Sequence, residues 1–172
     1  MASIGHVGVA LAAARLGETS GERWQRAQRS LALSALSLLP DADAIGFSLG
    51  VPYGAPFGHR GATHSLAFAL IVAVLATSAS ALFRLSKTKL FLLVFFCVAS
   101  HGLLDALSNG GRGVALLWPF TNARYFAPWR PIPVAPIGLR FLSPRGLYVA
   151  LSELVLFSPL LVYGLLPRSN RK

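Results

Sequence analysis

Residues 90–107 read LFLLVFFCVASHGLLDAL, an apolar run that carries a histidine and an aspartate near its end. A segment that spans a bilayer needs about 20 predominantly apolar residues, and this run meets that requirement. His101 and Asp105 are four positions apart, so a helix places both on one face. An apolar helix that ends in an ionisable pair predicts a transmembrane segment with a polar site near one membrane interface.

The composition of the whole chain supports a membrane location. The 172 residues are 54% hydrophobic and 13% charged, with a mean hydropathy of +0.59, whereas soluble domains carry about a quarter charged residues. The length suits one membrane-embedded domain over residues 1–172. The net charge of +10 lies in short clusters between apolar runs, so nucleic acid is not an expected partner.

Further apolar segments accompany residues 90–107 and complete a bundle. They cover residues 2–16, 31–51, 62–83 and 146–166. The segments 62–83 and 146–166 are long enough to span a bilayer. We expect the first segment to be short or half-inserted, and Pro40 to break the second. The sequence thus predicts an all-α, polytopic transmembrane bundle of about four to five helices.

The connections between these segments predict the orientation. Residues 15–29, 84–89 and 168–172 are basic, and the positive-inside rule places them on the cytoplasmic side. Residues 110–145 would lie on the opposite face, where their prolines forbid a long helix and their aromatic side chains suit an interfacial lid. We therefore divide the chain into metal-site helices (1–109), this lid (110–145) and a last transmembrane helix with a basic tail (146–172).

The rare histidines and acidic residues gather, under this topology, at the face opposite the basic clusters. They are His6, Asp41, Asp43, His59, His64, His101 and Asp105. Three carboxylates and four imidazoles require a counter-charge, and a divalent cation supplies it. Zinc is favoured, with manganese and iron as alternatives, and seven candidate ligands allow two or more ions.

Individual roles follow from position. If residues 41–43 are extended, Asp41 and Asp43 point the same way, and one of them is expected to orient the attacking water. Thr63 is a candidate N-cap for a helix that begins at His64. Glu153, deep in the last segment, is expected either to accept a hydrogen bond from a ligating histidine or to be a neutral acid bonded to a neighbouring helix. The residues expected to hold a phosphate-bearing substrate are Arg60, Arg112, Arg124 and Arg130.

Three blocks of this sequence resemble the signatures of the YdjM-type inner-membrane metal-dependent hydrolases. They are the stretches at residues 40–43, 58–65 and 100–105, and an early histidine corresponding to His6 belongs to the same pattern. That family is distantly similar to zinc-dependent phospholipases C. The resemblance implies metal-assisted hydrolysis, with a phosphoester favoured over an amide and membrane lipid as substrate, in the cytoplasmic (inner) membrane of a bacterium or archaeon. The active site would lie on the non-cytoplasmic face.

Two non-hydrolytic functions stay open at this point. A structural metal cluster could hold the helices together without catalysis. A metal transporter or sensor is the other alternative, although transporters bind their ions nearer the bilayer midplane than these residues are expected to lie.

Overall fold

The computed structural model describes residues 3–17 and 23–166, except for the side chain of Leu82. Within these ranges it is helical and contains no strand, which confirms the predicted class. The longer helices are α1 (Ile4–Leu16), α2 (Arg23–Leu38), α4 (Leu66–Ala76), α6 (Lys87–Ala106), α7 (Pro144–Leu156) and α8 (Ser158–Leu165). Short helical segments are η1 (Leu39–Ala44), α3 (Ile45–Ser48), η2 (Ala62–His64), η3 (Thr77–Ala79), α5 (Ser80–Phe83) and η4 (Gly138–Phe141).

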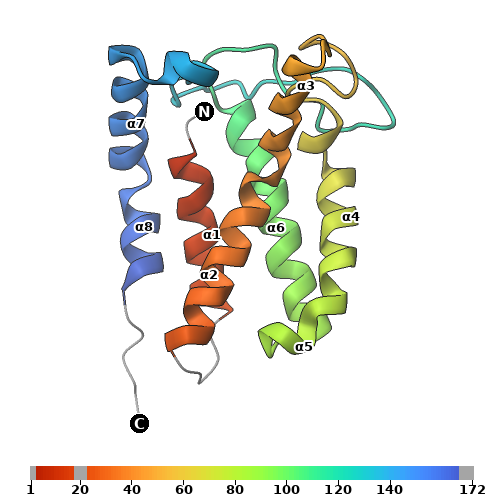
Figure 1. The fold of residues 1–172 in the computed structure, drawn as a ribbon, viewed down its shortest axis with the longest axis vertical. Coiled ribbons are helices and arrows are strands. Elements are labelled where there is room, and N and C mark those ends of the chain that lie inside the picture. The colour runs from red at the N-terminus through yellow and green to blue at the C-terminus, as the bar shows by residue number, and fades with distance from the viewer. Residues whose placement is uncertain (1–2, 18–22, 167–172) are drawn as a thin grey trace.

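The long helices run side by side and alternate in direction (Figure 1). Helix α6 is central, since it packs against α1, α2 and α4. Its fully covered Val94 and Cys97 lie in the apolar core with Leu33 of α2 and Ala73 of α4. Cys97 is therefore a small buried residue of this core.

Helix α1 packs against α2 and α8, and many of its buried residues are small. Gly5, Gly8 and Ala10 are all buried. A Cβ placed on Gly164 of α8 would lie 2.6 Å from the Cβ of Leu11, so the two helices touch at the backbone. Small residues let membrane helices approach closely where no hydrophobic effect drives them together.

Two helical runs are long and apolar enough to cross a membrane, within the described ranges: residues 23–48 and 87–106. Helices α7 and α8 qualify together, with a bend of 62° between them. The α-helix α2 ends at Leu38, just before Pro40, as expected, but the helical path continues through the tighter 3₁₀ turns of η1, which accommodate the proline near their start. The segment 62–83 instead forms a shorter apolar helix over residues 66–79. The count of four to five spans stays a prediction.

The two ends of the bundle differ in polarity. Arg15, Arg23, Arg84 and Lys87 lie where α1 ends, where α2 begins and at the turn from α5 to α6, which is the lower end in Figure 1. Residues 18–22 and the basic tail 167–172 lie outside the described residues. The opposite end carries η1, η2 and the long connection from α6 to α7, where isolated bridges join Ser108 to Ile132 and Val114 to Tyr125.

Candidate metal site

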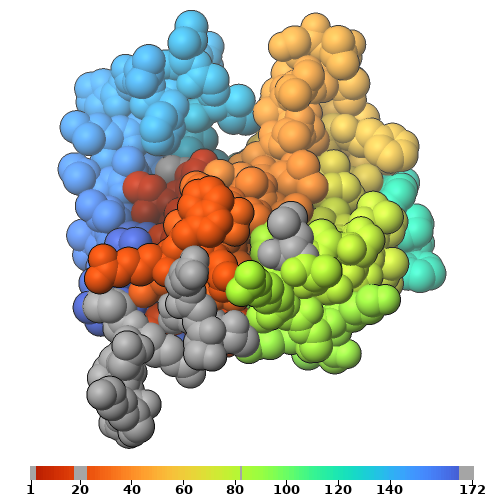
Figure 2. Space-filling model, turned by 60° about the horizontal axis from the view of Figure 1, so that its bottom comes forward, coloured from red at the N-terminus to blue at the C-terminus, as the bar shows by residue number. Residues whose placement is uncertain are grey.

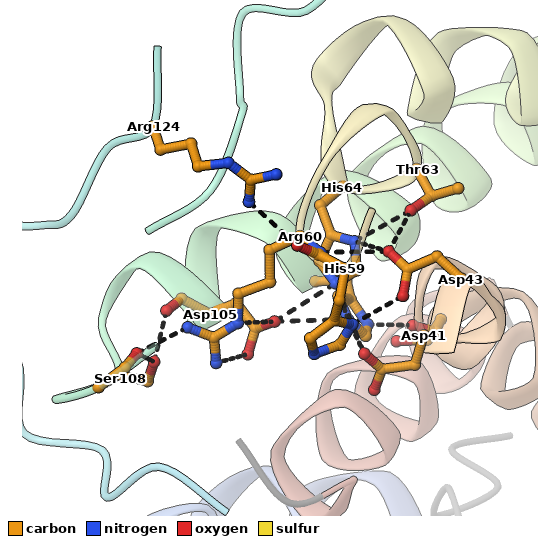
Figure 3. A network of polar contacts seen from close by, with 12 residues as sticks. Asp41, Asp43, His59, Arg60, Thr63, His64, Asp105, Ser108 and Arg124 are labelled. Atoms are coloured by element: carbon orange, nitrogen blue, oxygen red, sulfur yellow. Dashed lines mark hydrogen bonds and ion pairs between the residues drawn. The ribbon is translucent and has the colours of Figure 1, made fainter. Parts of the chain in front are cut away.

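Four ligand atoms converge at the end of the bundle that carries η1 and η2 (Figure 3). They are Asp41 Oδ1, His64 Nε2, His101 Nε2 and Asp105 Oδ2, and all lie within 4.8 Å of one another. The two Nε2 atoms are 3.1 Å apart. Asp41 Oδ1 lies 3.5 Å from His64 Nε2 and 3.3 Å from His101 Nε2. Asp105 Oδ2 lies 3.4 and 3.8 Å from the same two atoms.

These separations fit a metal ion. Four ligands about 2.0–2.1 Å from a tetrahedral zinc ion lie about 3.3 Å from each other. His64, His101 and Asp105 are nearly inaccessible, and the side chain of Asp41 is 33% exposed. The set of two imidazoles and two carboxylates, without a thiolate, suits zinc, manganese or iron. The predicted pairing of His101 with Asp105 on one face of α6 is thus observed.

Each histidine of this group is held from its other ring nitrogen. Nδ1 of His101 lies 2.7 Å from the carbonyl oxygen of Ser37, so it donates to that oxygen and leaves Nε2 free for a metal. Nδ1 of His64 lies 3.2 Å from Asp43 Oδ2. Ser37 also donates from Oγ to the carbonyl of His6, which links α2 to α1. This role of Ser37 has no sequence signal beyond a hydroxyl in an apolar helix.

Asp43 gathers several donors and contacts a different side of His64 from Asp41. Its Oδ1 lies 2.7 Å from His59 Nδ1, and its Oδ2 accepts from Thr63 Oγ1 at 2.7 Å and from the Arg60 backbone at 3.2 Å. Asp43, His59 and His64 form a second group with metal-ligand spacing. It shares His64 with the first group, and one neutral imidazole cannot give both nitrogens to metals because one of them carries a proton. This argues for one ion, with Asp43 orienting His64.

The local backbone differs from two expectations. Asp41 and Asp43 lie in the 3₁₀ helix η1 and not in an extended segment, and their carboxylates reach the two different nitrogens of His64. The N-cap of α4 is Ser65, whose Oγ accepts from the Phe68 backbone, because His64 belongs to η2. Thr63 is thereby freed to donate to Asp43.

Gly102 permits the close approach of α6 to η2. A Cβ at this position would lie 2.3 Å from the carbonyl oxygen of His64, a distance that side-chain carbons do not adopt. The glycine thus lets His64 reach His101, one residue earlier on the same helix.

Arg60 is buried and fixes Asp105. Its Nε and NH2 lie 3.2 Å from the two carboxylate oxygens, and its NH1 donates to the Gly110 carbonyl at 2.9 Å. The backbone of Arg60 is left-handed, with a φ of 61°, a conformation that a residue with a side chain adopts at a cost. The guanidinium predicted to hold substrate is therefore committed to orienting a candidate ligand.

His6 lies beside the four-atom cluster, but it belongs neither to that cluster nor to the group of Asp43, His59 and His64. Its ring stacks on that of His101, with centroids 3.7 Å apart and planes inclined by 7°. The ring is fully buried, and neither nitrogen has a hydrogen-bond partner among the described residues. Buried polar atoms rarely stay unsatisfied, so this orphaned ring also favours a cation nearby.

Glu153 is buried in α7 and accepts a hydrogen bond from the backbone of Gly5, next to His6. The predicted bond from a histidine ring to Glu153 is not among the contacts of the described residues. Neither nitrogen of His6 is bonded. Nδ1 of His101 contacts Ser37, and Nδ1 of His64 contacts Asp43. Glu153 instead fixes the first turn of α1, on which His6 stands.

A cavity of about 310 Å³ opens beside the cluster. Asp41, His59 and Arg60 form its polar wall, while residues 134–138 and Phe141 form an apolar wall. Figure 2 shows the molecule hollowed between the segment around η4, in blue, and α3, in orange. Tyr53 also lines the cavity, and burial raises the pKa of its phenol.

The other arginines proposed to hold substrate lie outside this cavity wall. Arg124 donates to the carbonyls of Tyr53, Ala55 and His59, so it fixes the 53–59 loop (Figure 3). Burial also lowers its pKa, although a guanidinium stays charged at physiological pH. Arg130 lies over the ring of Phe126, and Arg112 is exposed and approaches Gly54.

Comparison with known proteins identifies the family. The YdjM inner membrane protein family matches residues 1–169. The chain belongs to this family. It is 46% identical over 122 residues to the inner membrane protein YbcI of Escherichia coli (strain K12), a match that covers 70% of each chain. No solved structure matches. The family and the apolar helices together support an inner-membrane location, as the sequence predicted.

Proposed function

We propose that this protein is a membrane-embedded, metal-dependent hydrolase that cleaves a phosphoester or related bond of a lipid-like substrate at the non-cytoplasmic interface. The observation that carries the proposal is the convergence of four ligand atoms at the wall of a cavity. An amide is the alternative scissile bond.

The buried His64, His101 and Asp105 would hold the ion, which leaves Asp41 as the ligand that reaches the cavity. A bound divalent ion, zinc by preference, lowers the pKa of water and polarises a phosphoryl oxygen. The carboxylate of Asp41, which is 33% exposed and lines the cavity, would accept a proton from a water there and orient it.

His59 is the best candidate for the general acid. Its ring lines the cavity and is oriented by Asp43 through the 2.7 Å contact at Nδ1. The carboxylate holds the ring in one orientation, and a proton carried on the other ring nitrogen would pass to the leaving oxygen.

A second cavity supports a lipid-like substrate. It has a volume of about 540 Å³ and an apolar lining that includes Val7 of α1, Leu154 of α7 and Leu161 of α8. Ser3 lines both cavities, so an acyl chain in the apolar groove would lie next to a headgroup at the metal site.

The test is hydrolysis of a panel of phospholipids and N-acyl lipids by protein purified in detergent and loaded with zinc, manganese or iron. Turnover should require metal and should fall at least about 100-fold in Asp41→Asn and His59→Gln. A site closed by four protein ligands is also typical of structural zinc. Firm metal binding without turnover on any lipid of the panel would favour that alternative and contradict the hydrolase.

A further inference from the structure

Arg29 of α2 is a buried cation outside the metal site. It is 2% exposed, and its Nε and NH2 have no hydrogen-bond partner among residues 3–17 and 23–166. Its NH1 reaches the carbonyl oxygen of Phe83 only at 3.5 Å, the limit of a hydrogen bond. A buried guanidinium is costly unless an anion accepts its hydrogen bonds. The arrangement therefore calls for an anionic ligand.

A cavity of about 440 Å³ lies beside this guanidinium, between α2 and α5. Its lining changes in polarity along α2. The polar residues Gln25, Gln28 and Arg29 come first, and the apolar residues Leu31, Ala32 and Ala35 follow. Phe83 of α5 also lines the cavity. From Gln25 to Ala35 the helix rises by about 15 Å. A wall that is polar at one end and apolar at the other matches a ligand with an anionic head and an apolar chain.

The cavity lies at the opposite end of the bundle from the metal cluster. The beginning of α2 and α5 face the viewer in Figure 2, and they contact one another. The basic residues Arg23, Arg84 and Lys87 lie at the same end. Under the positive-inside orientation this end meets the cytoplasmic leaflet, whose anionic lipids attract basic segments.

We propose that this cavity binds one anionic phospholipid of that leaflet. Arg29 would hold the phosphate through the planar fork of its guanidinium, while the side-chain amides of Gln25 and Gln28 donate further hydrogen bonds. The first part of an acyl chain would lie along Leu31, Ala32 and Ala35. The site is separate from the metal centre and does not depend on hydrolysis.

The experiment is equilibrium binding of fluorescent phosphatidylglycerol and of fluorescent phosphatidylcholine to the full chain in neutral detergent. The wild-type protein should bind phosphatidylglycerol at least about tenfold more tightly, because its headgroup has a net negative charge, whereas the choline cation offsets the phosphate charge in phosphatidylcholine. Arg29→Gln should remove that preference, whereas Arg23→Gln, an exposed arginine of the same helix, should change it less than about twofold.

A second variant distinguishes a lipid from a free anion. Ala32→Phe should weaken phosphatidylglycerol binding by filling the apolar part of the cavity while leaving Arg29 in place. Helicity and thermal melting of each variant would check that it is folded. Unchanged lipid preference in Arg29→Gln, or an equal loss in Arg23→Gln, would overturn the proposal. Displacement of the lipid by an equal concentration of inorganic phosphate would show an anion site and would also overturn it.

Discussion

At the scale of single residues, the site depends on which ring nitrogen each histidine turns inward. The Ser37 carbonyl fixes His101 and the Asp43 carboxylate fixes His64, so both Nε2 atoms face the same point. Groups that orient a ligand from outside are worth a measurable part of metal affinity. The ligand geometry is therefore set by neighbours that contribute no ligand atom themselves.

The first prediction concerns Asp43. Asp43→Asn keeps the size of the side chain and removes the charge that orients His64, so metal affinity should fall about 10- to 100-fold. Competitive titration with a fluorescent zinc chelator would measure the change. His59→Gln is the matched control, since His59 contacts the same carboxylate from the cavity side and should leave affinity nearly unchanged. Equal affinity in Asp43→Asn and wild type would contradict this role.

The second prediction concerns His6, whose ring stacks on His101. Phe keeps an aromatic ring that can stack but offers no ligand atom, whereas Ala removes both. If His6 coordinates the ion, both variants should lose metal. If it only supports the ring of His101, His6→Phe should retain metal and His6→Ala should lose stability by about 2 kcal/mol or more. The unbonded nitrogens favour the first outcome. Metal content after purification, compared with thermal melting, separates the two.

The sequence predicted which residues gather but not how each is used. The spacing of His101 and Asp105 was sufficient to place them together, because residues four positions apart in an α-helix lie on the same face. The use of Arg60 could not be read in the same way. Its contact with Asp105 crosses 45 residues and depends on a left-handed turn at Arg60 itself, and neither the turn nor the contact has a local sequence signal.

At the scale of the elements, contacts between backbones decide where the helices lie. The clearest example is the crossing of α1 and α8 at Gly164, where an added Cβ would meet Leu11 at 2.6 Å and the Ala12 nitrogen at 3.0 Å. Gly8, on the other helix of the pair, has room, since its nearest neighbour would be Leu161 at 3.6 Å.

This contrast gives a matched pair of substitutions. Gly164→Ala should destabilise the protein by about 1–3 kcal/mol, because the helices must separate to admit the methyl group. Gly8→Ala, in ordinary contact, should be neutral or slightly stabilising, since alanine is the better helix former. Thermal melting in one detergent would compare them. Two equal shifts would mean that the helices do not touch as described.

The elements also show where sequence reasoning reaches its limit. The α-helix α2 ends before the proline at position 40, as the sequence indicated, yet η1 continues the helical path and carries both aspartates into the site. A proline near the start of a 3₁₀ turn costs little because its missing N–H is not required there. The apolar stretch 62–83 looked like one span, but its first residues form η2 and part of the site, because tertiary contacts to Asp43 and α6 outweigh hydropathy.

At the scale of the whole molecule, the candidate metal site and the basic residues lie at opposite ends of one bundle. We predict that the metal end faces away from the cytoplasm. In a Cys97→Ala background, a cysteine at the exposed Asn122 should react with an impermeant maleimide added to intact spheroplasts. One at the exposed Thr88, in the first turn of α6, should react only after lysis. Labelling of Thr88→Cys alone in intact spheroplasts would invert the orientation.

Elemental analysis of the purified protein tests whether His64, His101, Asp41 and Asp105 hold a divalent ion. We expect about one zinc, manganese or iron ion per chain, absent from His101→Ala and His64→Ala and retained in His59→Ala, with all variants helical and monodisperse. Wild-type protein that binds none of these metals when they are supplied, or a His101→Ala variant that keeps its full content, would contradict it.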